Sequence, residues 1–324
     1  MPLLDVRNLT TTFPIAGKAC PVVEGIDFTI EDGEVLAMVG ESGSGKSMTA
    51  LSIMGLVQAP PGCVTADAIT LSGESLLDRS PSELRHIRGR RMAMIFQEPM
   101  SSLNPVFTIG RQIGEVIRRH EGISLRAARP RVQQLLELVG IPDAARRIDS
   151  YPHEMSGGMR QRVMIAIALA CGPQLLIADE PTTALDVTVQ AQILDLLRDL
   201  RRRLGMAVLF ITHDLGLVAE FADRVLVLYA GRVVEQGRVR DIFRSPSHPY
   251  TAALLASMPA LARPGEILAS IAGSVPSLDA LPPGCRFAPR CGFVRAACSD
   301  ALPPLIPIRE GHATACIRHG EGVP

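Results

Sequence analysis

The sequence predicts an α/β fold: a mixed, mainly parallel sheet with helices packed around it. Two observations lead to this prediction. Three short runs are wholly apolar, as in parallel strands that are buried on both faces, and they lie at 35–39, 175–178 and 207–211. A glycine-rich loop at 40–47 joins the first run to a segment with helical character at 48–56.

The N-terminal half adds two further parts to this core. Residues 3–39 alternate short apolar segments with turn signals, which predicts antiparallel strands leading into the first parallel strand. Another strand ends the segment 83–96, and residues 108–170 are mostly helical in pattern. We therefore expect an antiparallel β subdomain and a helical subdomain at about 98–170.

The C-terminal part changes in character after the core. Residues 188–204 predict a helix, and residues 224–236 predict a hairpin that turns at Ala230-Gly231. After Ser245 prolines become dense, four cysteines appear and the periodicity weakens. We place a domain boundary near residue 240, with a core domain at 1–240 and a cysteine-rich extension at 241–324.

Composition narrows the class of function. Lysine and arginine total 33, as do aspartate and glutamate, so the formal net charge is zero and no basic field favours nucleic acid. The N-terminus lacks the charged and apolar regions of a signal peptide. The longest uncharged apolar stretch, 163–178, is too short to span a membrane. We expect a cytosolic chain that reaches a membrane only through partners.

The loop at 40–47 fits the phosphate-binding pattern GxxxxGK[S/T]. Its glycines let the backbone curl around phosphate oxygens, and the N–H groups at the following helix N-terminus face the anion. We expect Lys46 to reach the β- and γ-phosphates and the Ser47 hydroxyl to bind Mg²⁺. The fold class is thus refined to a P-loop NTPase core.

Acidic residues follow the second apolar run. We expect Asp179, at the end of a buried strand beside the first strand, to hold the Mg²⁺ shell, and Glu180 to polarise the attacking water. Two acids at a strand end also occur in solvated turns, but the upstream loop favours the catalytic interpretation.

Two more polar residues follow predicted strands. Gln97 comes after the strand ending at Phe96, where its amide can bind Mg²⁺ or the attacking water. His213 comes after the run ending in Ile211-Thr212, where an imidazole can register the γ-phosphate. Most glutamines are surface residues and most single histidines have a structural role. The predicted roles of Gln97 and His213 therefore depend on their positions directly after predicted strands.

A second anion-binding helix start lies at 155–162, Met-Ser-Gly-Gly-Met-Arg-Gln-Arg. Ser156 is a good N-cap, and Gly157 and Gly158 allow close backbone approach. The chain has one phosphate loop but two such helix starts. This predicts that two chains share nucleotides across an interface.

Taken in order, these motifs resemble the ATP-binding subunit of an ABC transporter over residues 3–240. The resemblance implies that 40–47 is the Walker A loop, Gln97 the Q-loop, 156–159 the signature, Asp179 and Glu180 the Walker B pair, 184–186 the D-loop and His213 the switch histidine. It implies catalysis by Glu180, His213 and Gln97, with Mg²⁺ at Ser47, Gln97 and Asp179. It implies ATP contacts at Phe13, Gly40, Ser42, Gly43, Ser44, Gly45, Lys46, Ser47, Met48, Ser156, Gly157, Gly158, Met159 and Asp186. Phe13 stands where the family has an adenine-stacking aromatic, and a plain core phenylalanine is the alternative.

The signature departs from the usual Leu-Ser-Gly-Gly-Gln of the family, with Met155 and Met159 at the outer positions. The serine and both glycines are kept, so we do not infer an inactive site. This signature, together with the tail segment Ser247-His248-Pro249-Tyr250-Thr251, resembles the oligopeptide and dipeptide importer branch.

The extension holds Cys285, Cys291, Cys298 and Cys316. Disulfides are not expected in a cytosolic chain, so the choice lies between a metal site and free thiols. The spacing lacks the paired C-x2-C of zinc ribbons and the known ferredoxin patterns. The resemblance to peptide-importer tails favours a structural [4Fe–4S] cluster, with zinc as the alternative.

The sequence therefore predicts an ATPase that powers di- or oligopeptide import, peripheral at the cytoplasmic face of the cell membrane. The expected partners are a related but non-identical ATPase, two transmembrane permease subunits and an extracytoplasmic binding protein, without nucleic acid. The alternatives are an importer of nickel or another small solute, a non-transport ABC ATPase, or a binding module in which ATP is regulatory.

Overall fold

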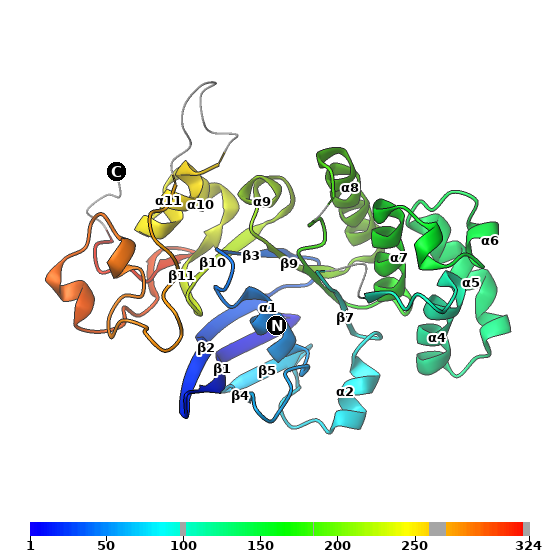
Figure 1. Ribbon diagram of the computed structural model, residues 1–324, viewed down its shortest axis with the longest axis horizontal. Coiled ribbons are helices and arrows are strands. Elements are labelled where there is room, and N and C mark those ends of the chain that lie inside the picture. The colour runs from blue at the N-terminus through cyan, green and yellow to red at the C-terminus, as the bar shows by residue number, and fades with distance from the viewer. Residues whose placement is uncertain (98–101, 184, 259–269, 320–324) are drawn as a thin grey trace. The chain divides into compact units, whose positions relative to one another are not determined.

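The computed structural model describes residues 1–97, 102–183, 185–258 and 270–319, and these form two compact units (Figure 1). Unit 1 contains residues 1–30, 35–77 and 210–324, and unit 2 contains residues 31–34 and 78–209. The C-terminal extension thus groups with the N-terminal strands. This division differs from the linear boundary near residue 240, which stays a prediction.

An antiparallel sheet in unit 1 has the strand order β2-β1-β5-β6, with β4 also paired to β1. The long strands β1 and β2 form because buried residues recur along both, and they pair from Leu4 opposite Ile30 to Ile15 opposite Lys18. The strands are β1 (Leu4–Ile15), β2 (Lys18–Ile30), β4 (Cys63–Thr65), β5 (Ala68–Leu71) and β6 (Glu74–Ser75).

A second sheet supplies the core of unit 1, in the order β12-β13-β11-β10-β3-β9. The strands β3 and β9 are buried at every position, as their continuous apolar runs require, and β10 is parallel to β3. The strands are β3 (Val35–Val39), β9 (Ala207–Thr212), β10 (Arg224–Tyr229), β11 (Arg232–Arg238), β12 (Ile306–Arg309) and β13 (His312–Thr314). The helices of unit 1 are α1 (Lys46–Ile53), α9 (Leu215–Phe221), α10 (Val239–Arg244) and α11 (Pro249–Ala256), with 3-10 turns η3 (Ala288–Arg290) and η4 (Ala296–Ser299).

The prediction of which strand lies beside β3, the first parallel strand, was wrong. We expected the strand that ends at Asp179 beside β3, but β9 is the neighbour of β3 in the sheet order. Both candidate strands are short and wholly apolar, so pattern alone does not distinguish them.

Unit 2 combines the parallel strands β7 (Met92–Ile95) and β8 (Leu175–Asp179) with a group of helices. Its longer helices begin at side-chain caps: the oxygens of Thr108, Ser124, Ser156 and Asp186 each accept a backbone N–H. The helices are α2 (Pro81–Ile87), α4 (Ile109–Glu121), α5 (Leu125–Leu138), α6 (Ala144–Arg147), α7 (Gly157–Leu169) and α8 (Val187–Leu204), with the 3-10 turn η1 (Pro152–Glu154). None of the helices within the described ranges has the length and apolar character needed to cross a membrane.

The extension is tied to the core of unit 1 by a fully buried carboxylate. Glu235 on β11 accepts the backbone N–H groups of Ser247 (2.7 Å) and His248 (2.9 Å), which lead into α11. Its Oε1 also lies 2.7 Å from Nε2 of His312 on β13. One side chain therefore joins two segments of the extension that are far apart in sequence.

We expect Glu235→Ala to lower the free energy of unfolding by about 2 kcal/mol or more, because it leaves two buried N–H groups and a buried imidazole without their acceptor. Urea unfolding and limited proteolysis of the full chain measure this effect. The control is Glu310→Ala, which removes an exposed carboxylate of the extension and should change little. Equal stability of both variants would contradict this account.

Candidate functional site

The phosphate-binding loop joins β3 to α1 in unit 1. Gly40, Gly43 and Gly45 all have positive φ (152°, 79° and 98°), which side chains rarely tolerate. At Gly40 a Cβ would lie 2.2 Å from the Leu228 carbonyl oxygen, whereas at Gly43 it would meet nothing within 4 Å. The first glycine is thus needed for packing as well as for its backbone conformation.

Lys46 lies across this loop as the sequence predicts. Its side chain is almost wholly buried, and Nζ donates to the carbonyl oxygens of Gly40 (2.7 Å) and Glu41 (3.0 Å). Ser44 is buried, and its carbonyl accepts the N–H of Gly231 at 2.9 Å. The ammonium is therefore held over the concave side of the loop, where a phosphate would compete for it.

Two other predicted residues also belong to unit 1. His213 is exposed and directly follows β9, and the next residue, Asp214, caps α9. Phe13 is half-buried on β1, opposite Cys20. Both positions are compatible with the predicted nucleotide contacts, and both roles stay predictions.

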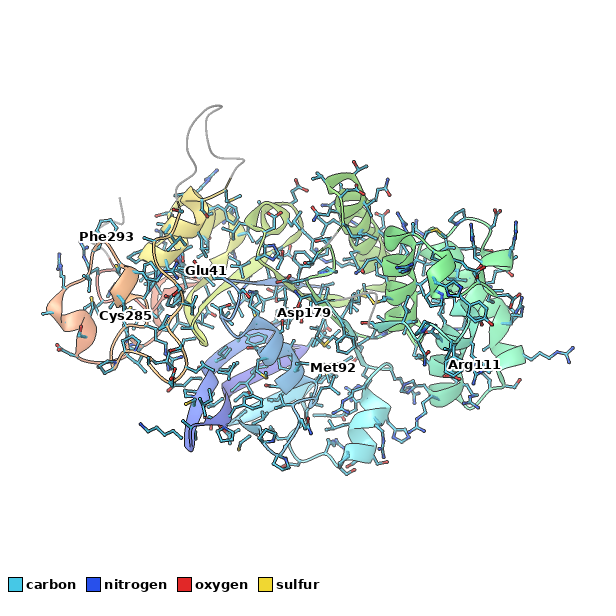
Figure 2. The ribbon with its side chains drawn as sticks, viewed as in Figure 1. Glu41, Met92, Arg111, Asp179, Cys285 and Phe293 are labelled. Carbon is cyan, nitrogen blue, oxygen red and sulfur yellow. The ribbon has the colours of Figure 1, made fainter. Side chains whose placement is uncertain are left out.

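Unit 2 carries the acidic pair. Asp179, which is labelled in Figure 2, ends β8 and is 4 % exposed. Glu180 follows with φ of 47°, a left-handed conformation that is uncommon outside glycine. Its Oε2 accepts Gln97 Nε2 at 3.0 Å and Thr183 Oγ1 at 2.8 Å.

The structure therefore brings Gln97 and Glu180 together, and it adds Thr183, which sequence reasoning missed. A threonine three residues after an acid carries no periodic signal of its own. The two hydrogen bonds orient the Glu180 carboxylate. This carboxylate is a candidate general base because it is positioned and half-buried.

The second predicted anion-binding helix start is also formed in unit 2. Ser156 caps α7, and its Oγ accepts the N–H of Met159 at 3.3 Å. A cavity of about 450 Å³ there is lined by the signature, Leu185 and Asp186. A Cβ at Gly158 would lie 2.9 Å from Val189 Cγ1, so the glycine keeps this helix start open. The predicted D-loop residue Ala184 lies outside the described residues.

The predicted Mg²⁺ ligands fall in different units, Ser47 in unit 1 and Gln97 and Asp179 in unit 2. Within the described ranges no three His, Cys, Asp or Glu side chains are arranged to hold a metal ion. The hydroxyl, amide and carboxylate oxygens are the kinds of donor that Mg²⁺ takes, so the donor set fits. The magnesium site stays a prediction.

The four cysteines of the extension line one small, enclosed cavity in unit 1, together with His248 and Phe287 (Figure 2 labels Cys285). Burial raises the pKa of the Cys285, Cys291 and Cys316 thiols, and Cys298 is 9 % exposed. The structure brings these four residues to one cavity, and their role as a metal site stays a prediction.

Comparison with known proteins agrees with this geometry. The family model described as "ABC transporter" matches residues 23–183, and the model described as "Oligopeptide/dipeptide transporter, C-terminal region" matches residues 234–298. The oligopeptide transport ATP-binding protein AppD of Bacillus subtilis is 51% identical, covering 98% of this chain and 97% of that protein. A Brucella ovis protein whose name provisionally assigns it to peptide import and ATP binding is 54% identical, covering 99% of this chain and 98% of that protein.

Solved structures show the same cassette. The ATP-binding cassette MJ0796, a dimer in a post-hydrolysis state bound to ADP and Pi, matches with a TM-score of 0.65 and 28% identity, covering 73% of this chain and 99% of that one. CbiO1 from Clostridium perfringens, part of the ABC transporter complex cbiONQ, matches with a TM-score of 0.63 and 27% identity, covering 75% of this chain and 91% of that one.

The fold and the loop thus define an ATP-binding cassette, the class of P-loop ATPase that couples hydrolysis to movement of other subunits. The chain belongs to the ABC transporter family. It is an ATPase, and the predicted fold of the cassette is confirmed.

Gly40→Ala tests the packing of the phosphate loop. We expect it to cost more than about 3 kcal/mol of stability, because the new Cβ collides with the Leu228 carbonyl and the backbone must move. Thermal unfolding of the nucleotide-free chain measures this loss.

Gly43→Ala is the matched control, because it adds only the strain of a left-handed alanine, about 1 kcal/mol. If Gly40→Ala is as stable as Gly43→Ala, the contact with Leu228 does not constrain the loop.

Proposed function

We propose that this chain is the ATP-hydrolysing subunit of an importer of di- or oligopeptides across the cytoplasmic membrane. The match of residues 234–298 to the C-terminal region of oligopeptide and dipeptide transporters carries this proposal. Full-length relatives named for peptide transport support it. An ATPase outside transport, or an importer of nickel, has no such support.

In the mechanism we propose, the loop at 40–47 binds the phosphates of ATP. Lys46 exchanges its bonds to the Gly40 and Glu41 carbonyls for bonds to the β- and γ-phosphates. The loop already holds this ammonium close to where the phosphates would bind. Phe13 would stack on the adenine, and His213 would hydrogen-bond the γ-phosphate. Mg²⁺, held by Ser47, Asp179 and Gln97, would neutralise charge that develops on the phosphates.

The Glu180 carboxylate takes the proton of the attacking water in this mechanism. The hydrogen bonds that its Oε2 accepts from Gln97 and Thr183 orient the carboxylate for this role. The helix start at Ser156 would bind the γ-phosphate of ATP held by a second subunit, with Asp186 beside it. Such sharing explains why one chain has a single phosphate loop and a separate anion-binding helix start.

The partners follow from the same proposal. A related, non-identical ATPase would complete the nucleotide sandwich, and two permease subunits and an extracytoplasmic binding protein would carry the peptide. Residues after Gln97 would transmit the motion to the permeases. The chain would lie at the cytoplasmic face of the membrane, with a cassette at 1–240 and a peptide-importer extension at 241–324.

We also propose a [4Fe–4S] cluster at the four cysteines. Four soft donors line a single apolar cavity with no carboxylate among its lining residues, which suits iron and sulfide. Around one zinc ion the four sulfurs would lie about 3.8 Å apart, a tetrahedron with Zn–S bonds of about 2.3 Å. Within the described residues no group of side chains is arranged to hold a metal ion, so the proposal depends on the shared cavity and on the resemblance of the tail.

Glu180→Gln tests the mechanism and the substrate together. We expect the rate of ATP hydrolysis to fall by about 100-fold or more while ATP binding persists, because an amide cannot accept the proton. The assembled transporter should retain ATP in a filter-binding assay, and cells carrying only this variant should lose uptake of a labelled tripeptide.

Lys46→Ala is the comparison variant for this test, because it should lose ATP binding itself. Normal turnover by Glu180→Gln would overturn the assignment of the base. If hydrolysis is lost but peptide uptake is unchanged, the assignment of a peptide substrate is overturned. The assignment of the chain as an ATPase would still stand.

The metal proposal is tested by measuring iron, acid-labile sulfide and zinc in the anaerobically purified chain, beside Cys291→Ser. We expect about four irons and four sulfides per chain, with loss of both in the variant. One zinc without sulfide would replace the cluster by a zinc site. If neither iron nor zinc is found, the four cysteines are free thiols and the metal proposal is overturned.

A further inference from the structure

The phosphate loop contains a carboxylate that its function does not explain. Glu41 directly follows Gly40, and its side chain is 26 % exposed. A negative charge here repels a triphosphate, and the repulsion is stronger near a protein surface than in bulk water. A loop that binds ATP therefore needs this charge to be neutralised or turned away.

A single arginine of the extension neutralises it. Arg290, on η3, donates from Nη1 to Glu41 Oε2 (2.7 Å) and from Nη2 to Glu41 Oε1 (3.0 Å). This is the two-bond geometry in which guanidinium and carboxylate interact most strongly. The Arg290 side chain is only 6 % exposed, so solvent screens the pair far less than it screens a surface ion pair.

The guanidinium is itself fixed. Nε donates to the Ala272 carbonyl at 2.8 Å, and Nη2 donates to the Ile271 carbonyl at 3.2 Å. Nη1 also lies 3.3 Å from the Tyr229 hydroxyl. One segment of the extension and one core strand thus hold Arg290 in the position from which it reaches the loop.

The backbone of the same loop residue is held separately. The Glu41 N–H donates to the Tyr250 hydroxyl at 2.9 Å, and Tyr250 is fully buried on α11. Its ring packs on Tyr229 and Phe287, with centroids 4.6 and 5.3 Å away. The Glu41 carbonyl accepts from Ser44 N and Lys46 Nζ. Every polar group of Glu41 therefore has a partner, and two of these partners come from the extension.

We propose that the C-terminal extension positions the phosphate loop for ATP, with Arg290 and Tyr250 as positioning residues that act through Glu41. Arg290 cancels the charge of Glu41 and turns its carboxylate toward the extension. Tyr250 fixes the main chain where the loop begins to curl. The proposal rests on the ATP site alone, so it holds whatever solute the transporter carries.

The first test is a double-mutant cycle on the full chain. Arg290→Ala should raise the Kd for a fluorescent ATP analogue, and the KM for ATP, by about tenfold, because an unopposed carboxylate then faces the phosphates. The kcat should change less than about threefold, because Glu180 and its hydrogen-bond partners are untouched.

Adding Glu41→Gln to Arg290→Ala should return the Kd to within about threefold of the unmodified chain, because the repelling charge is gone. A purely structural role predicts no such rescue, since the contacts of Arg290 with Ile271 and Ala272 are still missing. An unchanged Kd in Arg290→Ala, or failure of the second substitution to restore it, would overturn the proposal.

Two further variants keep the test decisive if Arg290→Ala folds poorly. Tyr250→Phe keeps the buried ring but removes the acceptor for the Glu41 N–H, and it should weaken ATP binding by about threefold or more. ATP affinity equal to that of the unmodified chain would contradict the positioning role. Arg309→Ala removes an exposed arginine of the extension, which contacts Ser245, and should leave ATP affinity unchanged. A loss as large as that in Arg290→Ala would show a general effect of charge, against the proposal.

Discussion

The close approach of three backbone segments around the phosphate loop is the constraint on which the rest of unit 1 depends. The turn at Gly231 donates to the Ser44 carbonyl and accepts from Glu24 N, so strand β2, the β10–β11 hairpin and the loop meet through main-chain atoms. A Cβ at Gly45 or Gly231 would lie 2.9 or 2.5 Å from the Val22 carbonyl. Because no side chain fits between these segments, the loop conformation is set by the strands around it rather than by the loop's own residues.

The extension reinforces this junction from outside. Arg286, which follows Cys285, donates to the Ala230 carbonyl and pairs with Glu24, and Arg290 pairs with Glu41. The same segment carries Phe287, which packs against Tyr229 and Tyr250. The segment from Cys285 to Cys291 thus supplies one aromatic ring that packs against the core of unit 1. It also supplies two arginines that bind residues of the phosphate loop and of β2. Such a segment has little core of its own, so its order depends on these contacts.

Features with a local physical cause could be predicted from the sequence. The buried strands, the glycine-rich loop, the Ser156 cap and the hairpin turn at 230–231 each follow from neighbouring residues. Features that depend on distant pairing could not. One such feature is that β9 lies beside β3, because the apolar runs at 175–178 and 207–211 were equally suitable for that place in the sheet. The contact between Glu41 and Arg290 joins residues 249 positions apart, and a single pair at that distance leaves no periodic trace. Thr183 was missed because a hydroxyl near an acid is common.

The phosphate loop and the proposed catalytic carboxylate belong to different units of the chain. The loop that binds phosphate, with the extension that holds it, belongs to unit 1, whereas Glu180 and the residues that orient it belong to unit 2. The predicted magnesium ligands come from both units, so the proposed site draws on both parts of the chain. The extension contacts the phosphate loop directly through Glu41. In our proposal, any change in the state of the four cysteines that moves Arg290 would act on the binding of ATP, and the hydrogen bonds to Glu180 would stay in place.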